Sequence, residues 1–422
     1  MLGTTTISRI ALDACAGHTA MALVRLWHQL DRDRPTGLQA AEQQVAGDRG
    51  GFDAARTAAV TALDAGDSEG LCTVLQQWPL AVLAALDEQR HLEGAGDDGS
   101  AAACVRIDGE DYWLHRRRLL RTADAPFPAR QSGHLQRWLK YHWILPARLG
   151  DIGITVRAAP HRVRARCADW LQRGRVRIWV GDFPDGIRPD WLPESECPGW
   201  RAVRLDDDAG TRRSGLLTML DAAAAAEADL VVLPELCLPP DLQAEVENWL
   251  DAHAHPFGLV LPGTFHEAEG PRFFNRARLR DGIGATVLEH RKLKSACFED
   301  RPEQIEGGGR LDLLDTPVGL FAIPICLDYC EIGIPFGELW QRLGLEWALV
   351  PAFGSDSSVR AHARRAKEMA RFFATVTVLA NQHPDGVAQD HGFVHHRARQ
   401  PTVITPSARC VEVKLQSVSA VK

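Results

Sequence analysis

The chain has 422 residues, of which 45% are hydrophobic and 24% are charged, and its formal net charge is −7. This composition is typical of a folded globular protein, and the length favours two domains over one core. The negative balance gives no electrostatic reason to expect nucleic-acid binding. No apolar run reaches the roughly 18 residues that a membrane span needs, and the N-terminal stretch MLGTTTISRIALDACAG lacks the apolar core of a secretory signal. We therefore expect a cytoplasmic protein without a membrane partner.

The ten cysteines are scattered along the chain without any CxxC pair. Cys326 and Cys330 lie four residues apart, which could indicate a metal site, but no histidine pair or second cysteine pair at the usual spacing completes one. We expect reduced thiols, no metal and no cofactor.

The N-terminal region, residues 1–172, is predicted to be a mainly helical extension of unknown role. Leucines and valines recur at three- and four-residue steps up to about residue 92, with a capping Asp or Ser before the apolar run at 67–92. The small and acidic residues 93–103 are typical of a linker or long loop. Asp108 and Gly109 then predict the turn of a short hairpin.

A basic cluster follows this hairpin and leads into a segment that contains Trp138, Tyr141 and Trp143. The cluster consists of Arg116, Arg117, Arg118 and Arg121. Basic residues interleaved with aromatics can bind single-stranded nucleic acid. The pattern is more typical of an amphipathic helix with solvated arginines, or of an interface between domains, so we expect no nucleic-acid partner.

From residue 173 onward the pattern alternates between strands and helices, which predicts a layered α/β domain over 173–422. The expected strands lie at 174–184, 228–235, 256–267, 284–294, 318–326, 345–354 and 374–383. The expected helices lie at 211–228, 240–254, 334–343 and 359–372.

Three chemically distinctive residues come at the ends of three of these strands. Glu235 closes LVVLPE, Lys292 follows GATVLEHR, and Cys326 closes VGLFAIPIC. Because active residues of α/β proteins collect at the carboxyl ends of strands, the three could converge. A thiol that attacks a carbonyl or nitrile carbon needs a proton acceptor and a nearby cation, which a carboxylate and a lysine could supply. Each residue taken alone is as consistent with an ordinary strand-end or core position.

The order Leu-Pro-Glu, Arg-Lys and Cys-x-Asp resembles the nitrilase superfamily of carbon–nitrogen hydrolases, over roughly residues 174–410. The resemblance implies a four-layer α-β-β-α sandwich with a Glu-Lys-Cys triad. It implies that Glu235 is the general base, Lys292 the charge-stabilising lysine and Cys326 the nucleophile. It also implies that Glu299 positions the lysine and the substrate, that the backbone N–H of Leu327 helps to hold the oxyanion, and that the glycines at 307–309 form a turn before the nucleophile strand.

This resemblance implies a thiol-dependent hydrolase of a non-peptide C–N bond, with no cofactor and with a small-molecule amide as substrate. Cys-x-Asp is closer to amidase-type members than to nitrilases, and an N-acyltransferase is a less favoured form of the same chemistry. Membership also implies a homo-oligomer. The chain departs from the family at His290, Lys294 and Leu327, where an aromatic, a histidine and an aromatic are usual.

Three alternatives stay open at this level. Lys294 could replace Lys292 as the active lysine. A cysteine–histidine arrangement could recruit a histidine from 383–396 with Asn381 as its orienting group. The domain could also be a catalytically silent scaffold that binds a ligand or partner, with the N-terminal region as the working module.

Overall fold

The computed structural model describes most of the chain in two compact units. The described residues are 2–32, 37–93, 102–117, 135–181, 183, 189–191, 199–205, 209–253, 257–298, 301–331, 333, 336–383, 391–396, 401–405 and 409–415. The first unit comprises residues 1–148 with the short segment 341–344, and the second comprises 149–340 and 345–420. None of the described helices is long and apolar enough to cross a membrane.

The described residues between 2 and 93 form six helices, which agrees with the helical character predicted for residues 1 to about 92. They are α1 (Thr4–Cys15), α2 (Thr19–Arg32), α3 (Gly37–Gly47), α4 (Arg49–Ala65), α5 (Ser68–Gln77) and α6 (Pro79–Glu93). Asp67 caps α5 by accepting a hydrogen bond from the Gly70 N–H at 2.9 Å, and Gly66 ends α4 in the left-handed conformation. The apolar faces of the helices form one core around Trp27 and Phe52.

The predicted hairpin is confirmed as β1 (Ala103–Ile107) and β2 (Glu110–Arg116). Its two turn residues, Asp108 and Gly109, both have positive φ, of 50° and 89°. A two-residue turn with positive φ at both positions matches the right-handed twist of the strands, which explains the Asp-Gly pair. The predicted linker at 93–103 lies mostly outside the described residues.

The prediction of an amphipathic helix after the basic cluster is wrong. This segment forms a short 3-10 helix (Leu135–Trp138) and then a strand, β3 (His142–Pro146), which pairs with β2. Arg117 is buried, with its guanidinium 3.3 Å from the centre of the Trp143 ring. A guanidinium desolvated on an aromatic face explains why this arginine is not solvated. Arg118 and Arg121 lie outside the described residues.

The second unit contains two large sheets. The first has the order β11-β12-β10-β9-β6-β22, and β13 pairs with the free side of β12. Its strands are β6 (Arg175–Val180), β9 (Leu230–Val232), β10 (Leu259–Leu261), β11 (Thr264–Glu269), β12 (Arg272–Asp281), β13 (Thr286–Arg291) and β22 (Cys410–Lys414). The parallel strands β6, β9 and β10 form its centre.

The second sheet has the order β21-β20-β19-β18-β17-β16-β5-β4. Its strands are β4 (Arg148–Leu149), β5 (Ile152–Ala158), β16 (Arg310–Thr316), β17 (Gly319–Ala322), β18 (Trp347–Phe353), β19 (Val376–Gln382), β20 (Gly392–His395) and β21 (Thr402–Val403). Two small two-stranded ribbons stand apart from the large sheets, β7 (Pro189–Trp191) with β8 (Ala202–Leu205) and β14 (Cys297–Phe298) with β15 (Arg301–Pro302).

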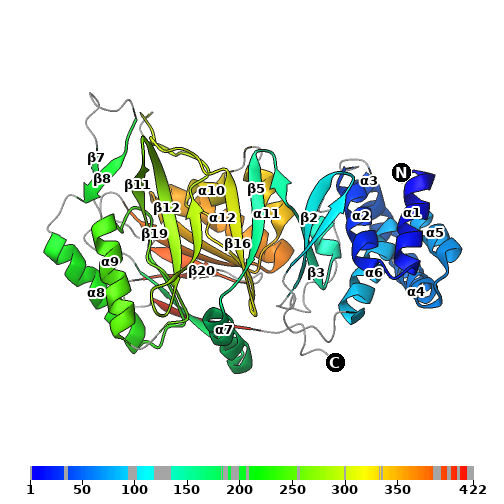
Figure 1. Ribbon diagram of the computed structural model, residues 1–422, viewed down its shortest axis with the longest axis horizontal. Helices are drawn as coiled ribbons and strands as arrows, with labels where there is room; N and C mark the ends of the chain where they lie inside the picture. The colour runs from blue at the N-terminus through cyan, green and yellow to red at the C-terminus, as the bar shows by residue number, and fades with distance from the viewer. Residues whose placement is uncertain are drawn as a thin grey trace. The chain divides into compact units, whose positions relative to one another are not determined.

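The two sheets pack face to face between two layers of helices, so the predicted α-β-β-α sandwich is confirmed. β9 lies against β18 and β19, and β13 lies against β16. On the first sheet, α8 (Ala209–Ala225) and α9 (Pro240–Ala252) bury Leu220, Val246 and Leu250 (Figure 1). On the second, α12 (Asp356–Phe373) covers β19 and β20 (Figure 1). The shorter helices are α7 (His161–Arg173), α10 (Leu327–Cys330) and α11 (Phe336–Leu343).

The second unit also contains β5 and α7, which the sequence analysis assigned to the extension 1–172. β5 pairs in parallel with β16, from Gly153 opposite Arg310 to Ala158 opposite Asp315. α7 contacts β6 and β16 and buries Cys167 and Trp170. A strand within the sheet and a helix on it cannot be separated from the sandwich core, which is why the compact unit begins at residue 149.

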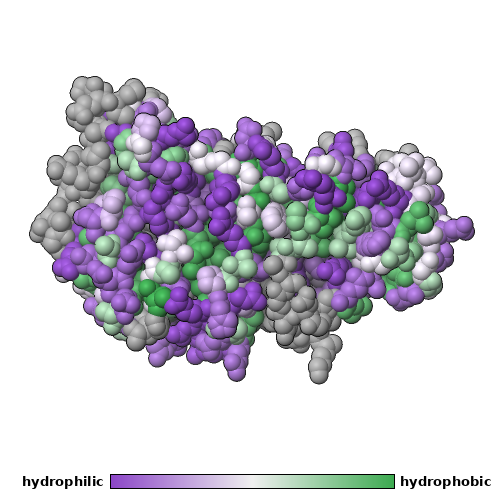
Figure 2. All heavy atoms as spheres, viewed as in Figure 1, coloured by the Kyte–Doolittle hydropathy of each residue, from purple (hydrophilic) through white to green (hydrophobic). Residues whose placement is uncertain are grey.

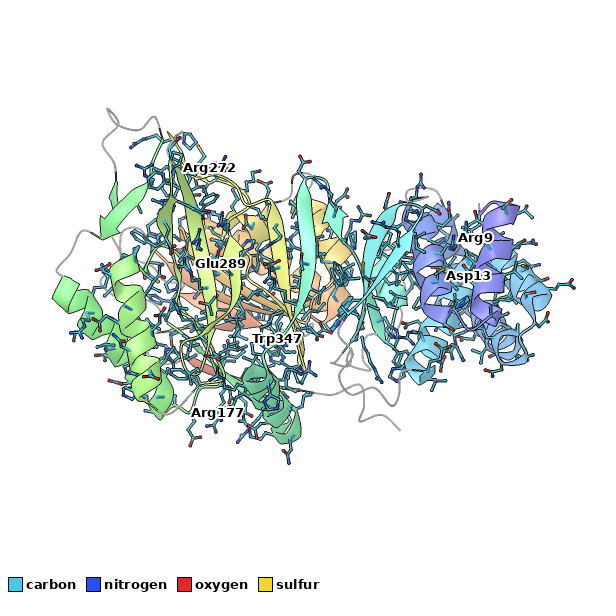
Figure 3. The ribbon with its side chains drawn as sticks, viewed as in Figure 1. Arg9, Asp13, Arg177, Arg272, Glu289 and Trp347 are labelled. Carbon is cyan, nitrogen blue, oxygen red and sulfur yellow. The ribbon has the colours of Figure 1, made fainter. Side chains whose placement is uncertain are left out.

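Charged side chains cover the hairpin strands of the first sheet. Arg278 binds Glu267 through two contacts of 2.6 Å, while Arg276 and Arg291 each donate to Glu269 at 2.6 Å. Figure 2 shows hydrophilic residues gathered over these strands, and Glu289 on β13 belongs to the same face (Figure 3). Glu269 is 54% exposed, so its ion pairs contribute about 0–1 kcal/mol each, whereas Arg278 and Glu267 are only 19% and 12% exposed and are partly shielded from solvent.

We expect Gly263, just before β11, to tolerate no side chain. Its φ is +101°, and a Cβ there would overlap the Cys237 sulfur and the Pro234 carbonyl oxygen, beneath the strand end that carries Glu235. Gly263→Ala should therefore lower the free energy of unfolding by about 3 kcal/mol, measured by urea denaturation.

Gly270→Ala is the matched control for this substitution. Gly270 also has positive φ, +61°, but no atom lies within 4 Å of the position that an alanine methyl group would occupy there. Gly270→Ala should therefore lower the free energy of unfolding only by the cost of a left-handed backbone conformation in alanine, about 1 kcal/mol. Equal losses in the two variants would contradict the steric explanation.

Candidate active site

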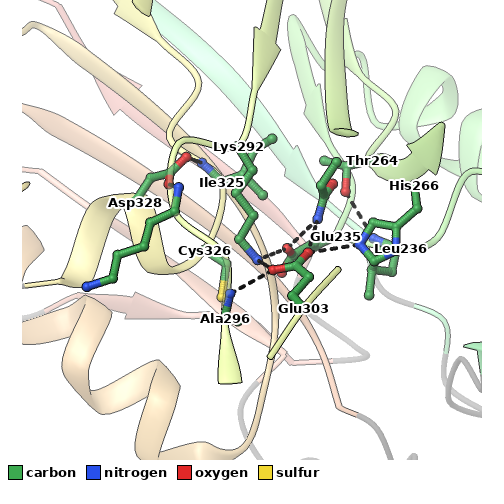
Figure 4. A network of polar contacts seen from close by, with 12 residues as sticks. Glu235, Leu236, Thr264, His266, Lys292, Ala296, Glu303, Ile325, Cys326 and Asp328 are labelled. Carbon is green, nitrogen blue, oxygen red and sulfur yellow. Dashed lines mark hydrogen bonds and ion pairs between the residues drawn. The ribbon is translucent and has the colours of Figure 1, made fainter. Parts of the chain in front are cut away.

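A buried lysine lies between two buried carboxylates at the centre of the second unit. The Nζ atom of Lys292 is 2.8 Å from Oε1 of Glu235 and 2.7 Å from Oε2 of Glu303 (Figure 4). The side chains of all three are at most 2% exposed. Burial of an ion costs several kcal/mol unless partners compensate it, so the ammonium group depends on both carboxylates.

Glu235 reaches this position from the end of β9. Its N–H donates to the carbonyl of Ala352 on the other sheet at 3.3 Å. The next residue, Leu236, has a positive φ of 59°, and its N–H donates to the Thr264 hydroxyl at 3.1 Å. The amide of Asn275 donates to Oε1 of Glu235 at 2.8 Å. These contacts turn the chain sharply at the strand end and fix the orientation of the carboxylate.

Lys292 directly follows β13. Its N–H donates to the carbonyl of Asn275, and its carbonyl accepts from the N–H of Gly308, both at 2.9 Å. A Cβ on Gly308 would meet the Arg291 carbonyl oxygen at 2.6 Å, so only glycine permits this approach. The predicted glycine turn at 307–309 therefore packs against the backbone that carries Lys292.

Glu303 is the site residue that the sequence analysis missed. Besides Lys292, its carboxylate accepts from Nε2 of His266 at 2.8 Å, from Asn275 at 3.1 Å and from the N–H of Ala296 at 2.8 Å. The sequence analysis selected Glu299, which lies outside the described residues. Three glutamates occur between 299 and 306, and no periodicity in a loop distinguishes the one that turns inward.

Cys326 occupies a strained turn between β17 and α10. Its φ and ψ are 45° and −107°, and non-glycine residues with positive φ are uncommon and energetically costly. Its N–H donates to the Pro351 carbonyl at 2.9 Å, and its carbonyl accepts from the N–H of Tyr329 at 3.0 Å. Nε2 of His362, on α12, lies 3.0 Å from the same carbonyl. The side chain of Cys326 lies beside Lys292 in the same cluster (Figure 4), near enough for the charges of Lys292 and Glu235 to affect its pKa.

Asp328, from the Cys-x-Asp motif, ties the cysteine turn to the lysine segment. Its buried carboxylate accepts from the N–H groups of Leu293 and Lys294 at 3.0 and 2.9 Å, and from Ile325 at 3.3 Å. Nε2 of His290 lies 3.2 Å from it. One carboxylate thus connects the backbone next to Lys292 on the first sheet to the backbone of Cys326 on the second.

The two carboxylates around Lys292 are not equivalent. Burial raises the pKa of Glu235, and the charge of Glu303 adds to that rise while Lys292 opposes it. Burial also acts to raise the pKa of Glu303, but Lys292 and the hydrogen bond from His266 outweigh it and lower that pKa to about 2. Glu303 is therefore a fixed anion, whereas Glu235 is the carboxylate suited to accept and return a proton.

The pKa values of Lys292 and Cys326 are both raised above their ordinary values. Burial acts to lower the pKa of Lys292, but Glu235 and Glu303 raise it well above its ordinary value, so the ammonium persists. Burial raises the pKa of Cys326, and Glu235 adds to that rise, while His362 and Lys292 act to lower it. The thiol therefore depends on a base and on neighbouring cations to form a thiolate.

Two of the alternatives left open by the sequence can be compared with these contacts. Nζ of Lys294 lies 2.6 Å from Glu331, and the Lys294 side chain is 38% exposed, whereas that of Lys292 is 1% exposed. Asn381 donates to the Gly354 carbonyl at 3.0 Å. Within the described part of the chain, the histidine seen in contact with Cys326 is His362, on α12.

This arrangement combines a thiol, a proton acceptor and a buried cation, which is the set that nucleophilic attack on a carbonyl carbon needs. Among the described residues, no group of three or more His, Cys, Asp or Glu side chains could hold a metal ion. Leu327 begins α10 directly after the thiol, so its backbone N–H belongs to the same turn.

The Glu303 pKa leads to a pH-dependent prediction for stability. Because its folded pKa of about 2 lies below the ordinary value near 4.3, Glu303 stabilises the fold fully above that value and progressively less as the pH falls toward 2. Glu303→Gln should lower the free energy of unfolding by about 3 kcal/mol at pH 7. In urea denaturation, the difference in free energy of unfolding between Glu303→Gln and wild type should become smaller as the pH is lowered from 5 to 3.

Glu306→Gln provides the matched control, since Glu306 pairs with Arg272 on the exposed surface at 3.0 Å. The free energy of unfolding of this variant should differ little from that of wild type at any pH between 5 and 3. A Glu303→Gln deficit that stays constant down to pH 3 would contradict the assignment of a fixed carboxylate.

Comparison with known proteins identifies the second unit. The family model described as carbon–nitrogen hydrolase matches residues 205–346, which include Glu235, Lys292, Glu303 and Cys326. No curated protein sequence matches the chain.

Solved structures with likeness to this chain include the C. elegans NitFhit protein, with 17% identity, a TM-score of 0.42 and coverage of 57% of this chain and 61% of that one. An amidase from Nesterenkonia sp. has 19% identity, a TM-score of 0.40 and coverage of 57% and 89%. Saccharomyces cerevisiae Nit3, described as a member of branch 10 of the nitrilase superfamily, has 15% identity and a TM-score of 0.41, with coverage of 58% of this chain and 90% of that one. The family of the domain therefore follows from the match to the family model and not from these structures. The C-terminal part of the chain contains a carbon–nitrogen hydrolase domain over residues 205–346.

Proposed function

We propose that this domain is a thiol-dependent hydrolase that cleaves the C–N bond of a small, non-peptide amide. The observation that carries the proposal is the buried ammonium of Lys292, held at 2.8 and 2.7 Å by Glu235 and Glu303 beside the thiol of Cys326. A structural ion pair needs no strained cysteine next to it, whereas acyl transfer to a thiol needs all of these groups together.

In the first half of the reaction, Glu235 takes the proton of the Cys326 thiol, and the thiolate attacks the amide carbon. The resulting oxyanion is stabilised by the ammonium of Lys292 and the backbone N–H of Leu327. Glu235, now protonated, gives its proton to the leaving nitrogen, and the C–N bond breaks to leave a thioester on Cys326. The raised pKa of Glu235 suits a group that must both accept and return a proton.

In the second half, water attacks the thioester while Glu235 accepts a proton from it. The carboxylic acid departs, and the thiol of Cys326 is regenerated. Glu303 stays ionised throughout and keeps Lys292 oriented, which assigns it a positioning role. Transfer of the acyl group to an amine instead of water would make the domain an N-acyltransferase, and a nitrile would follow the same thiol chemistry.

The family resemblance further supports a homo-oligomer, as part of the same proposal. The protein's mass in solution, measured by light scattering, tests that part separately. A cytoplasmic location is proposed from the sequence alone.

Incubation with a set of small amides, followed by intact-mass measurement, tests the function. We expect wild type to accumulate an acyl adduct and to release ammonia or amine. Cys326→Ala should lose the adduct and reduce turnover by at least about 10³-fold, because it removes the nucleophile. Cys297→Ala, at an exposed cysteine, should behave as wild type.

If no amide or nitrile yields an adduct or product, the domain is a silent scaffold that binds a ligand or partner. If a product forms and Cys326→Ala retains full turnover, the thioester mechanism is wrong while hydrolysis stands. Adduct formation followed by transfer to an added amine would identify an acyltransferase.

The pH dependence of kcat/KM tests the role of Glu235. The base must be ionised, so the rate should fall as the pH drops through the pKa of Glu235, and this acid limb should lie above the ordinary glutamate value near 4.3 because that pKa is raised. Glu235→Gln should lower kcat by at least about 10²-fold and abolish the limb. An unchanged limb in this variant would assign it to another group.

A further inference from the structure

His362 is a fully buried histidine beside the nucleophile turn, and the proposed mechanism does not use it. It lies on α12 with no exposed surface. Nδ1 lies 2.8 Å from the carbonyl oxygen of Ser358, one turn earlier in the helix. Nε2 lies 3.0 Å from the carbonyl oxygen of Cys326. Both ring nitrogens therefore face backbone carbonyl oxygens.

This geometry determines the protonation of the ring. A carbonyl oxygen only accepts hydrogen bonds, so each of these contacts requires an N–H on the imidazole. A neutral ring has one N–H and would place a bare lone pair against the other carbonyl oxygen at hydrogen-bond distance, in a fully buried site. The doubly protonated ring satisfies both acceptors.

The charges around the site favour the same state. Lys292 and Glu303 carry opposite charges. In the mechanism proposed above Glu235 and Cys326 exchange one proton, so these two together carry one negative charge wherever that proton resides. A cation on His362 offsets this negative charge, whereas a neutral His362 leaves it uncompensated.

The other titratable groups around the site do not supply the missing cation. His266 accepts from the N–H of Ala202 through Nδ1 at 2.9 Å, so it donates to Glu303 as a neutral ring. Asp328 adds a negative charge, stabilised by backbone N–H groups and His290. Lys294 is paired with Glu331.

The ring also faces two thiols. Those of Cys326 and Cys330, both near α10, interact with it, and they raise the pKa of His362 well above its ordinary value although burial acts to lower it. On its own helix, Arg365 donates to the Glu331 carbonyl at 3.1 Å and to Glu368 at 2.9 Å. The charged groups nearest the ring are thus accounted for, and Cys326 is the one whose ionisation changes in the reaction.

We propose that His362 is a positioning residue that remains an imidazolium, holds the Cys326 turn through its carbonyl, and stabilises the thiolate of Cys326. No proton transfer is assigned to it, because a doubly protonated ring has no lone pair that could accept the thiol proton. The proposal deepens the proposed function, since it concerns the nucleophile assigned there.

The alkylation rate of Cys326 by iodoacetamide, followed against pH by peptide mass spectrometry, reports the thiolate directly and needs no substrate. His362→Gln keeps a side-chain N–H donor but no charge. We expect its alkylation midpoint to move to higher pH by about one unit, which corresponds to an about tenfold lower rate at pH 7. His362→Lys, which restores a cation, should recover part of the rate.

His253→Gln is the matched control. His253 is the C-cap residue of α9, and its Nδ1 makes a similar contact with the carbonyl four residues earlier, that of Trp249, at 2.7 Å. It should leave the Cys326 profile unchanged. An unchanged alkylation midpoint in His362→Gln, with the fold intact by circular dichroism, would overturn the proposal for His362 even if amides are hydrolysed. A shifted midpoint without amide hydrolysis would support the proposal for His362 and would count only against the proposed hydrolase function.

A measurement on the unmodified protein covers the case in which the variants do not fold. In nitrogen-15 NMR of histidine-labelled wild type at pH 8.5, exposed histidines are neutral because their ordinary pKa is about 6.5. His362 should still show two protonated ring nitrogens. The absence of any such imidazolium signal would overturn the proposal.

Discussion

The buried ammonium of Lys292 is the constraint on which the site depends. A charge with 1% exposure is tolerated because Glu235 and Glu303 both lie within 2.8 Å of it. Each carboxylate needs further donors, and Asn275 and His266 supply them. The result is a closed polar network in which loss of one member leaves another unpaired, so its geometry is fixed more rigidly than apolar packing alone would achieve.

That network joins two sheets. Glu235 and Lys292 come from strand ends of the first sheet, whereas Cys326 follows a strand of the second. The contact from the Glu235 N–H to the Ala352 carbonyl, and those from Asp328 to the backbone after Lys292, cross between them. The Cys-x-Asp motif therefore has a physical reason: the carboxylate two residues after the thiol sets where the thiol sits relative to the lysine.

Three features of the structure depend on tertiary contacts that no local sequence pattern encodes. The segment around Trp143 had the composition of an amphipathic helix, yet it pairs with β2 and covers Arg117 with an aromatic ring, a tertiary contact that no local pattern encodes. β5 follows an apparently helical region, and only its pairing with β16 makes it part of the sandwich. Glu303 lies in a loop, where side-chain direction follows from the contacts of the folded chain.

The sequence by itself determined the alternation of strands and helices, the Asp108-Gly109 turn, and the three strand ends that carry Glu235, Lys292 and Cys326. It did so because hydrophobic periodicity and turn chemistry are local, and because the order of the motifs survives in the chain. Only the tertiary structure decided which glutamate faces Lys292, which lysine is buried, and that His362 lies against Cys326. Those depend on burial and on distances between residues up to 57 positions apart, which no local pattern contains.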